Sequence, residues 1–189
     1  MHRKHVVIAA VVAVMAASPL HAQSRVGRDS LTRLNRFGRD LAYGTLMGFG
    51  YAGIDQWSNS PSEWGRGWDG YGKRLASNLG EFYIQEGVTE GLAAVMNHPL
   101  DYAHCSCHDT GGRVVWAVQG AVLDVMPDGH RTLAIPRIVG AYAGAIAQAS
   151  WRPDTGDRWR VGLTNGTTAL AIGALINLYH EFHHDVGLP

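Results

Sequence analysis

The sequence has very little cysteine: among its 189 residues, only Cys105 and Cys107 occur. Because a single residue separates them, a bond between them would close a very small, strained ring. Such a pair cannot join distant segments of the chain. The sequence therefore excludes a fold stapled by disulfides, and the domain must be stabilised by its core.

Neither sign of charge is in excess, because 16 Lys and Arg residues balance 16 Asp and Glu residues. Without Arg3 and Lys4, 14 basic and 16 acidic residues remain, a formal charge of −2. This balance gives no electrostatic basis for binding nucleic acid, and we expect no nucleic-acid partner.

The N-terminal region lacks an apolar run long enough to cross a membrane. Residues 6–17 form a twelve-residue apolar run, whereas a spanning helix needs about 20 residues. Arg3 and Lys4 precede the run, Pro19 follows it, and Ala22 offers a small residue for cleavage. We expect residues 1–22 to be a secretory signal peptide, with an uncleaved anchor helix as the alternative. Residues 23–189 are then a single helical domain, exported to the periplasm or to a membrane-associated place in the cell envelope.

What the mature chain does contain is helical periodicity, interrupted by clusters of Pro and Gly. We expect helices over about residues 30–57, 71–97, 113–121, 136–151 and 157–184, with N-caps at Ser30 and Asp157. Residues 122–126 and 130–135 alternate around Pro127-Asp128-Gly129, which predicts a small β-hairpin. The predicted fold is mostly α: an antiparallel helical bundle of about five helices with one small β-hairpin.

Small residues recur at four-residue spacing in the last two predicted helices. Gly140 and Gly144 form one such pair, and Gly162 and Gly166 form another. Faces of this kind let helix backbones approach closely. Residues 161–179 carry no charge, but several Thr and Asn side chains make them polar for lipid. We expect a buried helical hairpin, with membrane insertion as the alternative and homo-oligomerisation through the small-residue faces as a further use.

The stretch from Asn59 to Arg74, NSPSEWGRGWDGYGKR, combines glycines with aromatic residues and is expected to be a structured connection. It resembles a stretch of uncharacterised exported bacterial proteins with the pattern N-S-P-x-x-W-G-x-G-x-x-G-Y-G-K-R. The segments DGHRTLAIPRIVGAYAGA and WRPD resemble later parts of the same proteins. The resemblance covers most of the mature chain and implies no known activity, cofactor or catalytic residue.

The sequence His180-Glu181-Phe182-His183-His184 matches the zinc-protease pattern H-E-x-x-H. On a helix, His180 and His184 would share a zinc ion and Glu181 would activate a bound water. The third ligand usual in such sites does not follow before Pro189, and Asp185 is too close. The resembling proteins, moreover, have Arg-Glu-Phe at this point. We expect an ordinary helix end, where each lost interaction costs about 0.3–1 kcal/mol, rather than a hydrolytic zinc site.

The predicted loop before the third helix is dense in potential metal ligands. Seven occur within twelve residues: His98, Asp101, His104, Cys105, Cys107, His108 and Asp109. Cys and His together favour zinc or copper, although the spacing is not C-x-x-C. The alternative is an exposed polar loop whose ligands are incidental. We predict no required cofactor and regard zinc or copper as the candidates.

Two carboxylates of the second predicted helix, Glu86 and Glu90, continue the apolar stripe of Leu75, Leu79 and Phe82 at helical spacing. We expect both to be partly buried, where a carboxylate needs a partner. Arginines at positions 113 and 137 are the structural candidates, and a metal ion is the functional one.

The sequence offers no complete active site. We therefore expect a non-enzymatic, exported cell-envelope protein with a structural or binding role, whose partner is an envelope protein or a membrane surface. The alternative is a metal-binding protein or zinc-dependent hydrolase that uses either the H-E-x-x-H residues or the loop at residues 98–109.

Overall fold

The structure is a computed structural model that describes residues 26–153, 156–183 and 185. The predicted signal peptide and His184 lie outside the described residues. The chain divides into two compact units, residues 1–43 and 44–189. In the first, the described residues belong to one helix and include an Arg39–Asp40 ion pair at 3.6 Å. The single-domain organisation remains a prediction.

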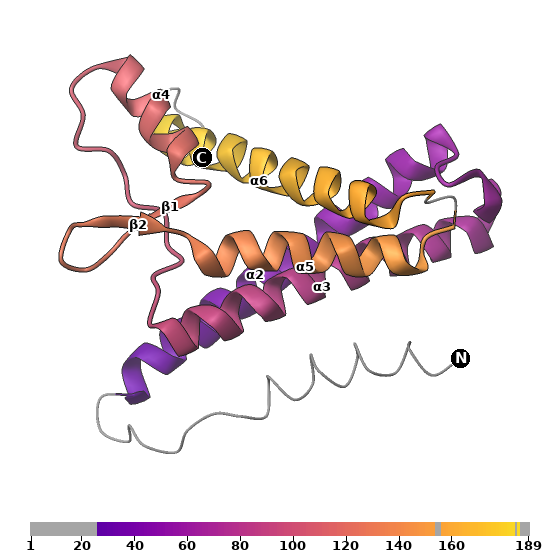
Figure 1. Ribbon diagram of the computed structural model, residues 1–189, viewed down its shortest axis with the longest axis horizontal. Coiled ribbons are helices and arrows are strands. Elements are labelled where there is room, and N and C mark those ends of the chain that lie inside the picture. The colour runs from indigo at the N-terminus through magenta and orange to yellow at the C-terminus, as the bar shows by residue number, and fades with distance from the viewer. Residues whose placement is uncertain (1–25, 154–155, 184, 186–189) are drawn as a thin grey trace. The chain divides into compact units, whose positions relative to one another are not determined.

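The mostly α fold with one small hairpin is confirmed (Figure 1). The described residues form five α-helices: α2 (Val26–Ser58), α3 (Trp68–Met96), α4 (Thr110–Gln119), α5 (Ile135–Trp151) and α6 (Arg158–Phe182). A short 3-10 helix, η1 (Ser62–Trp64), lies between α2 and α3. Strands β1 (Leu123–Val125) and β2 (Arg131–Leu133) pair antiparallel, with Asp124 opposite Thr132.

Side-chain caps explain where α4 and α6 begin. The side chain of Asp157 accepts a hydrogen bond from the amide of Arg160 at the start of α6, as predicted. Asp109 accepts one from Gly112, so α4 begins at Thr110, three residues before the predicted start. The predicted cap at Ser30 is wrong: α2 already runs through this residue, because no proline interrupts the chain after Val26.

The small-residue faces predicted from the sequence bring α5 close to both of its neighbours. A Cβ atom at Gly144 would lie 2.7 Å from the backbone oxygen of Glu81 on α3. A Cβ atom at Gly162 would lie 2.7 Å from Cγ1 of Ile146, where α6 crosses α5. Real Cβ atoms do not approach other atoms so closely, so glycine is required at both contacts.

Within the second unit, α2 packs on the predicted apolar stripe of α3. A Cβ atom at Gly44 would overlap the ring of Phe82, and one at Gly48 would lie 2.7 Å from Leu79. The hydroxyl groups of Thr45 and Tyr83 lie 2.9 Å apart beside this contact. Within residues 44–189, α3, α5 and α6 are successive antiparallel neighbours, and the part of α2 after residue 43 runs antiparallel to α3. The predicted antiparallel bundle is confirmed for these residues.

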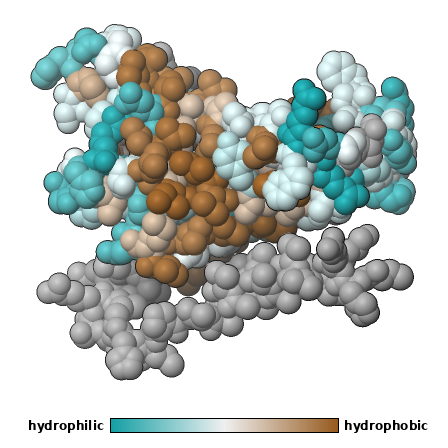
Figure 2. Space-filling view, viewed as in Figure 1, coloured by the Kyte–Doolittle hydropathy of each residue, from teal (hydrophilic) through white to brown (hydrophobic). Residues whose placement is uncertain are grey.

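The core of the described residues consists of small side chains. Its buried hydrophobic residues are all alanines: Ala52, Ala93, Ala117, Ala121, Ala134, Ala141, Ala145 and Ala149. Large apolar side chains lie outside instead, among them Leu46, 67% exposed, and Leu175, 64% exposed. Figure 2 shows apolar side chains gathered over the middle of the viewed face. This distribution is the reverse of the usual one in water.

Candidate functional site

The first residue of the predicted ligand loop, His98, is buried against the β-hairpin. Its Nδ1 lies 2.9 Å from Oδ2 of Asp124, and Nη1 of Arg137 lies 3.0 Å from Oδ1 of the same carboxylate. His98 and Asp124 are only 6% and 5% exposed. The strand alternation of β1 turns Asp124 inward. Since a buried carboxylate needs a partner, this cluster has the composition of a structural contact.

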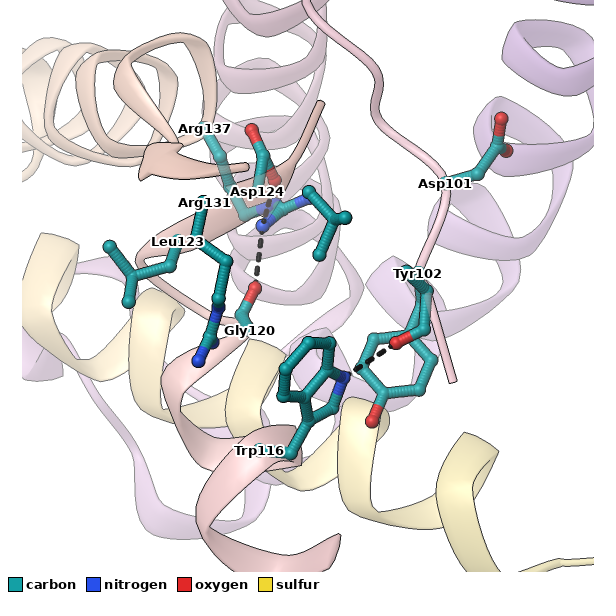
Figure 3. A pocket seen from close by; sticks show the side chains of 10 residues that line it. Asp101, Tyr102, Trp116, Gly120, Leu123, Asp124, Arg131 and Arg137 are labelled. Atoms are coloured by element: carbon teal, nitrogen blue, oxygen red, sulfur yellow. Dashed lines mark hydrogen bonds and ion pairs between the residues drawn. The ribbon is translucent and has the colours of Figure 1, made fainter. Parts of the chain in front are cut away.

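Beside Asp124 and Arg137 lies a cavity of about 10 Å³ (Figure 3). Its walls include Arg131 and Trp116, whose indole nitrogen donates to the backbone oxygen of Ala103 at 2.8 Å. This volume holds about one water molecule. Pockets for small-molecule ligands usually measure about 300–1,000 Å³. The cavity as described has room for about one water molecule only.

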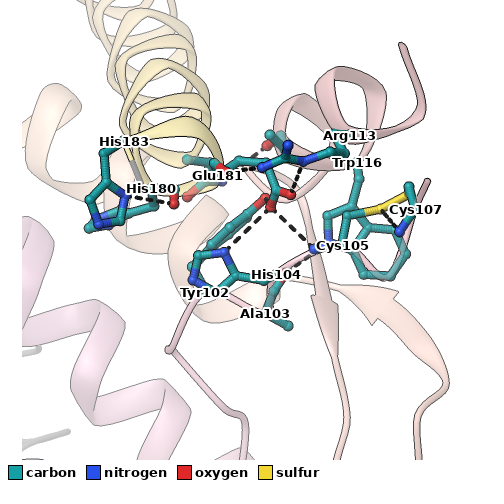
Figure 4. A network of polar contacts seen from close by, with 12 residues as sticks. Tyr102, Ala103, His104, Cys105, Cys107, Arg113, Trp116, His180, Glu181 and His183 are labelled. Atoms are coloured by element: carbon teal, nitrogen blue, oxygen red, sulfur yellow. Dashed lines mark hydrogen bonds and ion pairs between the residues drawn. A yellow bond between two sulfur atoms is a disulfide. The ribbon is translucent and has the colours of Figure 1, made fainter. Parts of the chain in front are cut away.

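The rest of the loop contacts the end of α6, so the two stretches singled out from the sequence meet in space (Figure 4). The carboxylate of Glu181 accepts hydrogen bonds from the hydroxyl of Tyr102, at 2.8 Å, and from the amide of Cys105, at 3.1 Å. Nδ1 of His104 lies 3.6 Å from the same carboxylate. Glu181 is therefore the centre of the network.

Arg113 completes this network from α4. Its Nε donates to Oε1 of Glu181 at 2.9 Å, and its Nη2 donates to the backbone oxygen of the same residue. A third bond joins Nη1 to Asp185. The guanidinium group also lies 4.4 Å from the ring centre of Phe182, within range of a cation–π contact. One arginine thus binds three residues of the last helical turn and the segment after it.

The electrostatics of the network hold Glu181 ionised. Burial raises the pKa of this carboxyl group, but hydrogen bonds from Arg113, Tyr102 and the Cys105 amide outweigh burial and lower the pKa below its ordinary value. Burial, and then the hydrogen bond to Glu181, raise the pKa of the Tyr102 phenol. A carboxylate that is 2% exposed and held by several donors is suited to anchoring and is poorly placed to activate a water.

The expectation that Glu181 makes only ordinary helix-end interactions is wrong, because its side chain is buried between α4, α6 and the loop. His180 is exposed, and its ring stacks on Tyr102 with 6.4 Å between centroids. Its predicted co-ligand, His184, lies outside the described residues. The prediction that these residues do not form a hydrolytic zinc site, and the alternative in which the two histidines share a metal ion, both remain untested.

The structure disperses the other predicted ligands. Cys105 and Cys107 form a disulfide, so neither sulfur is a thiolate ligand in this state. Asp101 and His108 are exposed, while the side chain of Asp109 caps α4. Among the residues that the structure describes, no three His, Cys, Asp or Glu side chains come together in a way that could hold a metal ion. Zinc or copper binding by the complete loop remains the untested alternative.

Glu86 and Glu90 are half-buried on α3, as predicted. Of the arginines expected as their partners, Arg113 pairs with Glu181 and Arg137 with Asp124. Pairing of either arginine with Glu86 or Glu90 remains a prediction. Periodicity places a residue on a helix face, but it does not select which of several cations lies opposite that face.

Sequence reasoning missed a second polar network, built on Arg74. The side chain of Arg74 is fully buried near the start of α3. It donates to backbone oxygens of the connection from α2 at distances of 2.6–2.9 Å; these acceptors belong to Ser60, Pro61 and Gly65. It also bonds the side-chain oxygen of Gln56 at 2.6 Å. This arginine organises the Asn59–Arg74 stretch, whose only sequence signal was a conspicuous run of glycine and aromatic residues.

Comparison with protein-family models, with curated proteins and with solved structures finds no match to this chain.

Proposed function

We propose that this chain is a non-enzymatic, exported protein of the cell envelope whose helical bundle associates with a membrane through its apolar outer face. One observation carries the proposal: alanine and glycine fill the helix contacts, while the large apolar side chains lie outside. The predicted signal peptide supports export.

Side-chain size argues for lipid as the surroundings of this face. In water, burying one large apolar side chain stabilises a fold by about 1.5–3 kcal/mol, so such side chains normally occupy the core. Helices in lipid gain nothing from burying leucine, and they associate instead through small residues that allow close approach. The contacts of Gly140, Gly144, Gly162 and Gly166 are of the second kind. An apolar surface left outside such contacts indicates an interaction site.

The helix α6 provides the clearest part of this face. By length and composition it could cross a membrane, and only 11% of its most apolar window is buried. The hydroxyls of Thr164, Thr167 and Thr168 each donate to the carbonyl oxygen four residues earlier, at 2.9–3.0 Å. The amide of Asn177 donates to the backbone oxygen of Ala117. These polar groups are already satisfied, so they oppose lipid contact less than the sequence suggests.

Vesicle flotation of the exported protein tests the proposal. The wild-type protein is expected to float with phosphatidylethanolamine–phosphatidylglycerol vesicles without detergent. Replacing the exposed residues Leu163, Leu175 and Ile176 with serine should lower the bound fraction at least about tenfold, because apolar contact area is lost. The matched control replaces the same three residues with methionine, which keeps the apolar area and should keep the binding.

Two results would overturn the proposal. One is a wild-type protein that stays wholly soluble and monomeric at low salt in the presence of vesicles. The other is a stable oligomer that buries this face and does not float, since the apolar residues would then form a protein interface.

A further inference from the structure

The tryptophans of this chain are segregated at one end of the second unit. Of the 6 in the sequence, all but Trp116 lie where α2 ends, α3 begins, α5 ends and α6 begins. Figure 1 shows these two helix connections at the same end. We call this the tryptophan end, defined by residues 55–74, 150–153 and 156–160.

Specific contacts hold the two connections of the tryptophan end together. Nη2 of Arg152, just after α5, lies 3.4 Å from the backbone oxygen of Ser60 and 3.5 Å from Oδ2 of Asp55. Its guanidinium group lies 5.8 Å from the ring centre of Trp64. Trp151 donates from its indole nitrogen to the hydroxyl of Ser77 at 3.0 Å. These contacts join α2, α3 and the end of α5, so the tryptophan end is a built surface.

Three indole rings project from this surface. Trp57, Trp68 and Trp159 are 85%, 89% and 67% exposed. They come from the end of α2, the start of α3 and the start of α6. A tryptophan ring offers about 150–250 Å² of contact area and carries one polar N–H group. Three such rings exposed on one surface indicate that this surface contacts an environment that is partly apolar and partly polar.

Basic side chains accompany the rings. Arg66, Lys73, Arg158 and Arg160 are exposed at the tryptophan end. Exposed carboxylates are also present: Asp69 is paired with Lys73, Asp157 caps α6, and Glu63 lies on η1. The end therefore presents cations capable of contacting phosphate without a large net charge. Tryptophan combined with Arg or Lys is the composition found where helices meet the headgroup region of a membrane.

We infer that the tryptophan end seats in the headgroup region of a phospholipid bilayer and so orients the bundle on the membrane. This inference rests on the proposed membrane association and adds which part of the molecule lies at the headgroups. Trp159 and Leu163 are one helical turn apart on α6 and both are exposed. The surface formed by the exposed indole rings is therefore continuous with the apolar face of α6, which we propose contacts lipid.

Tryptophan fluorescence of the vesicle-bound protein tests this placement. The vesicles contain phosphatidylethanolamine and phosphatidylglycerol, and they carry either a shallow quencher near the headgroups or a deep quencher at the acyl-chain ends. On binding, the wild-type emission should shift to shorter wavelength, and the shallow quencher should reduce it more than the deep one. The variant Trp57→Phe/Trp68→Phe/Trp159→Phe should show a smaller shift and less shallow quenching than the wild type, with the remaining signal coming from Trp64 and Trp151 at the same end. The control Trp116→Phe should keep both, because Trp116 lies on α4 near the β-hairpin.

A binding measurement complements the fluorescence. Replacing Trp57, Trp68 and Trp159 with alanine should lower vesicle partitioning at least about tenfold, while circular dichroism stays unchanged because all three rings are exposed. Wild-type protein that floats with vesicles but shows no shift, or deeper quenching than shallow, would overturn the inference and leave the membrane association standing. Wild-type protein that does not bind vesicles at all would overturn both.

Discussion

Arg113 on α4 and Glu181 at the end of α6 are joined by a hydrogen-bonded ion pair 2.9 Å long, across 68 positions of sequence. The carboxylate is almost fully buried, whereas the guanidinium group is about one-quarter exposed. The pair ties α4 and the loop at residues 98–109 to the last turn of the chain. It gives the acidic residue of the H-E-x-x-H sequence a structural role.

Replacing Glu181 with glutamine should lower the free energy of unfolding by about 2–3 kcal/mol, because the buried charge-assisted hydrogen bonds are lost and Arg113 keeps only the exposed carboxylate of Asp185 as a counter-ion. Urea unfolding followed by circular dichroism measures the change. The control Glu63→Gln, at an exposed position of η1, should stay within about 0.5 kcal/mol of the wild type. Equal stability of the two variants would contradict the anchoring role of Glu181.

Acid should weaken the same contact. Because the folded-state pKa of Glu181 is lowered, its ionisation stabilises the fold above the ordinary carboxyl pKa. That contribution is lost as the pH falls through the folded pKa. Unfolding midpoints should therefore fall more steeply for the wild type than for Glu181→Gln below about pH 4.5. Parallel pH profiles for the two proteins would show that another group controls acid stability.

Arg74→Lys should destabilise the fold by about 2–4 kcal/mol although charge is conserved. The planar guanidinium group serves several separated backbone oxygens at once, and one ammonium group cannot reach them all. Thermal unfolding compared with Arg66→Lys, an exposed control in the same connection, measures the difference. If the two substitutions shifted the melting temperature equally, Arg74 would not organise this segment.

Two helical glycines should respond to alanine in opposite directions. Gly144→Ala should destabilise the fold by about 1–3 kcal/mol, because its methyl group would lie 2.7 Å from the backbone oxygen of Glu81. Gly91→Ala should stabilise α3 by about 0.5–1 kcal/mol, since no atom lies within 4 Å of the added group. Denaturant unfolding of both variants gives the signs. Stabilisation by Gly144→Ala would contradict the close contact between α3 and α5.

Much of the fold is predictable from the sequence because its signals are local. The predicted hairpin at residues 122–126 and 130–135 appears as β1 and β2. The start of α6 depends on the cap at Asp157, and the four-residue spacing of Gly140 and Gly144 marks a real contact. These features depend on residues within one or two turns of each other, so a linear pattern contains them.

The candidate site was only partly predictable. Both ligand-rich stretches were found, but their meeting at Glu181 was not, nor were the partners that Arg113 and Arg137 select. Arg74 was missed because its acceptors are backbone oxygens, which every residue has and no side-chain pattern marks. Interactions of this kind depend on where separate segments meet in space.

By itself the sequence determined the helices, the hairpin, the small-residue faces and the absence of a disulfide framework, because these follow from local propensities and spacing. Only the tertiary structure decided that Glu181 is buried in an anchoring network, that Arg74 is the centre of the α2–α3 connection, and that Trp57, Trp68 and Trp159 share one end. Burial and proximity are properties of the packed chain, and a side chain acquires them only when segments distant in sequence close around it or leave it exposed.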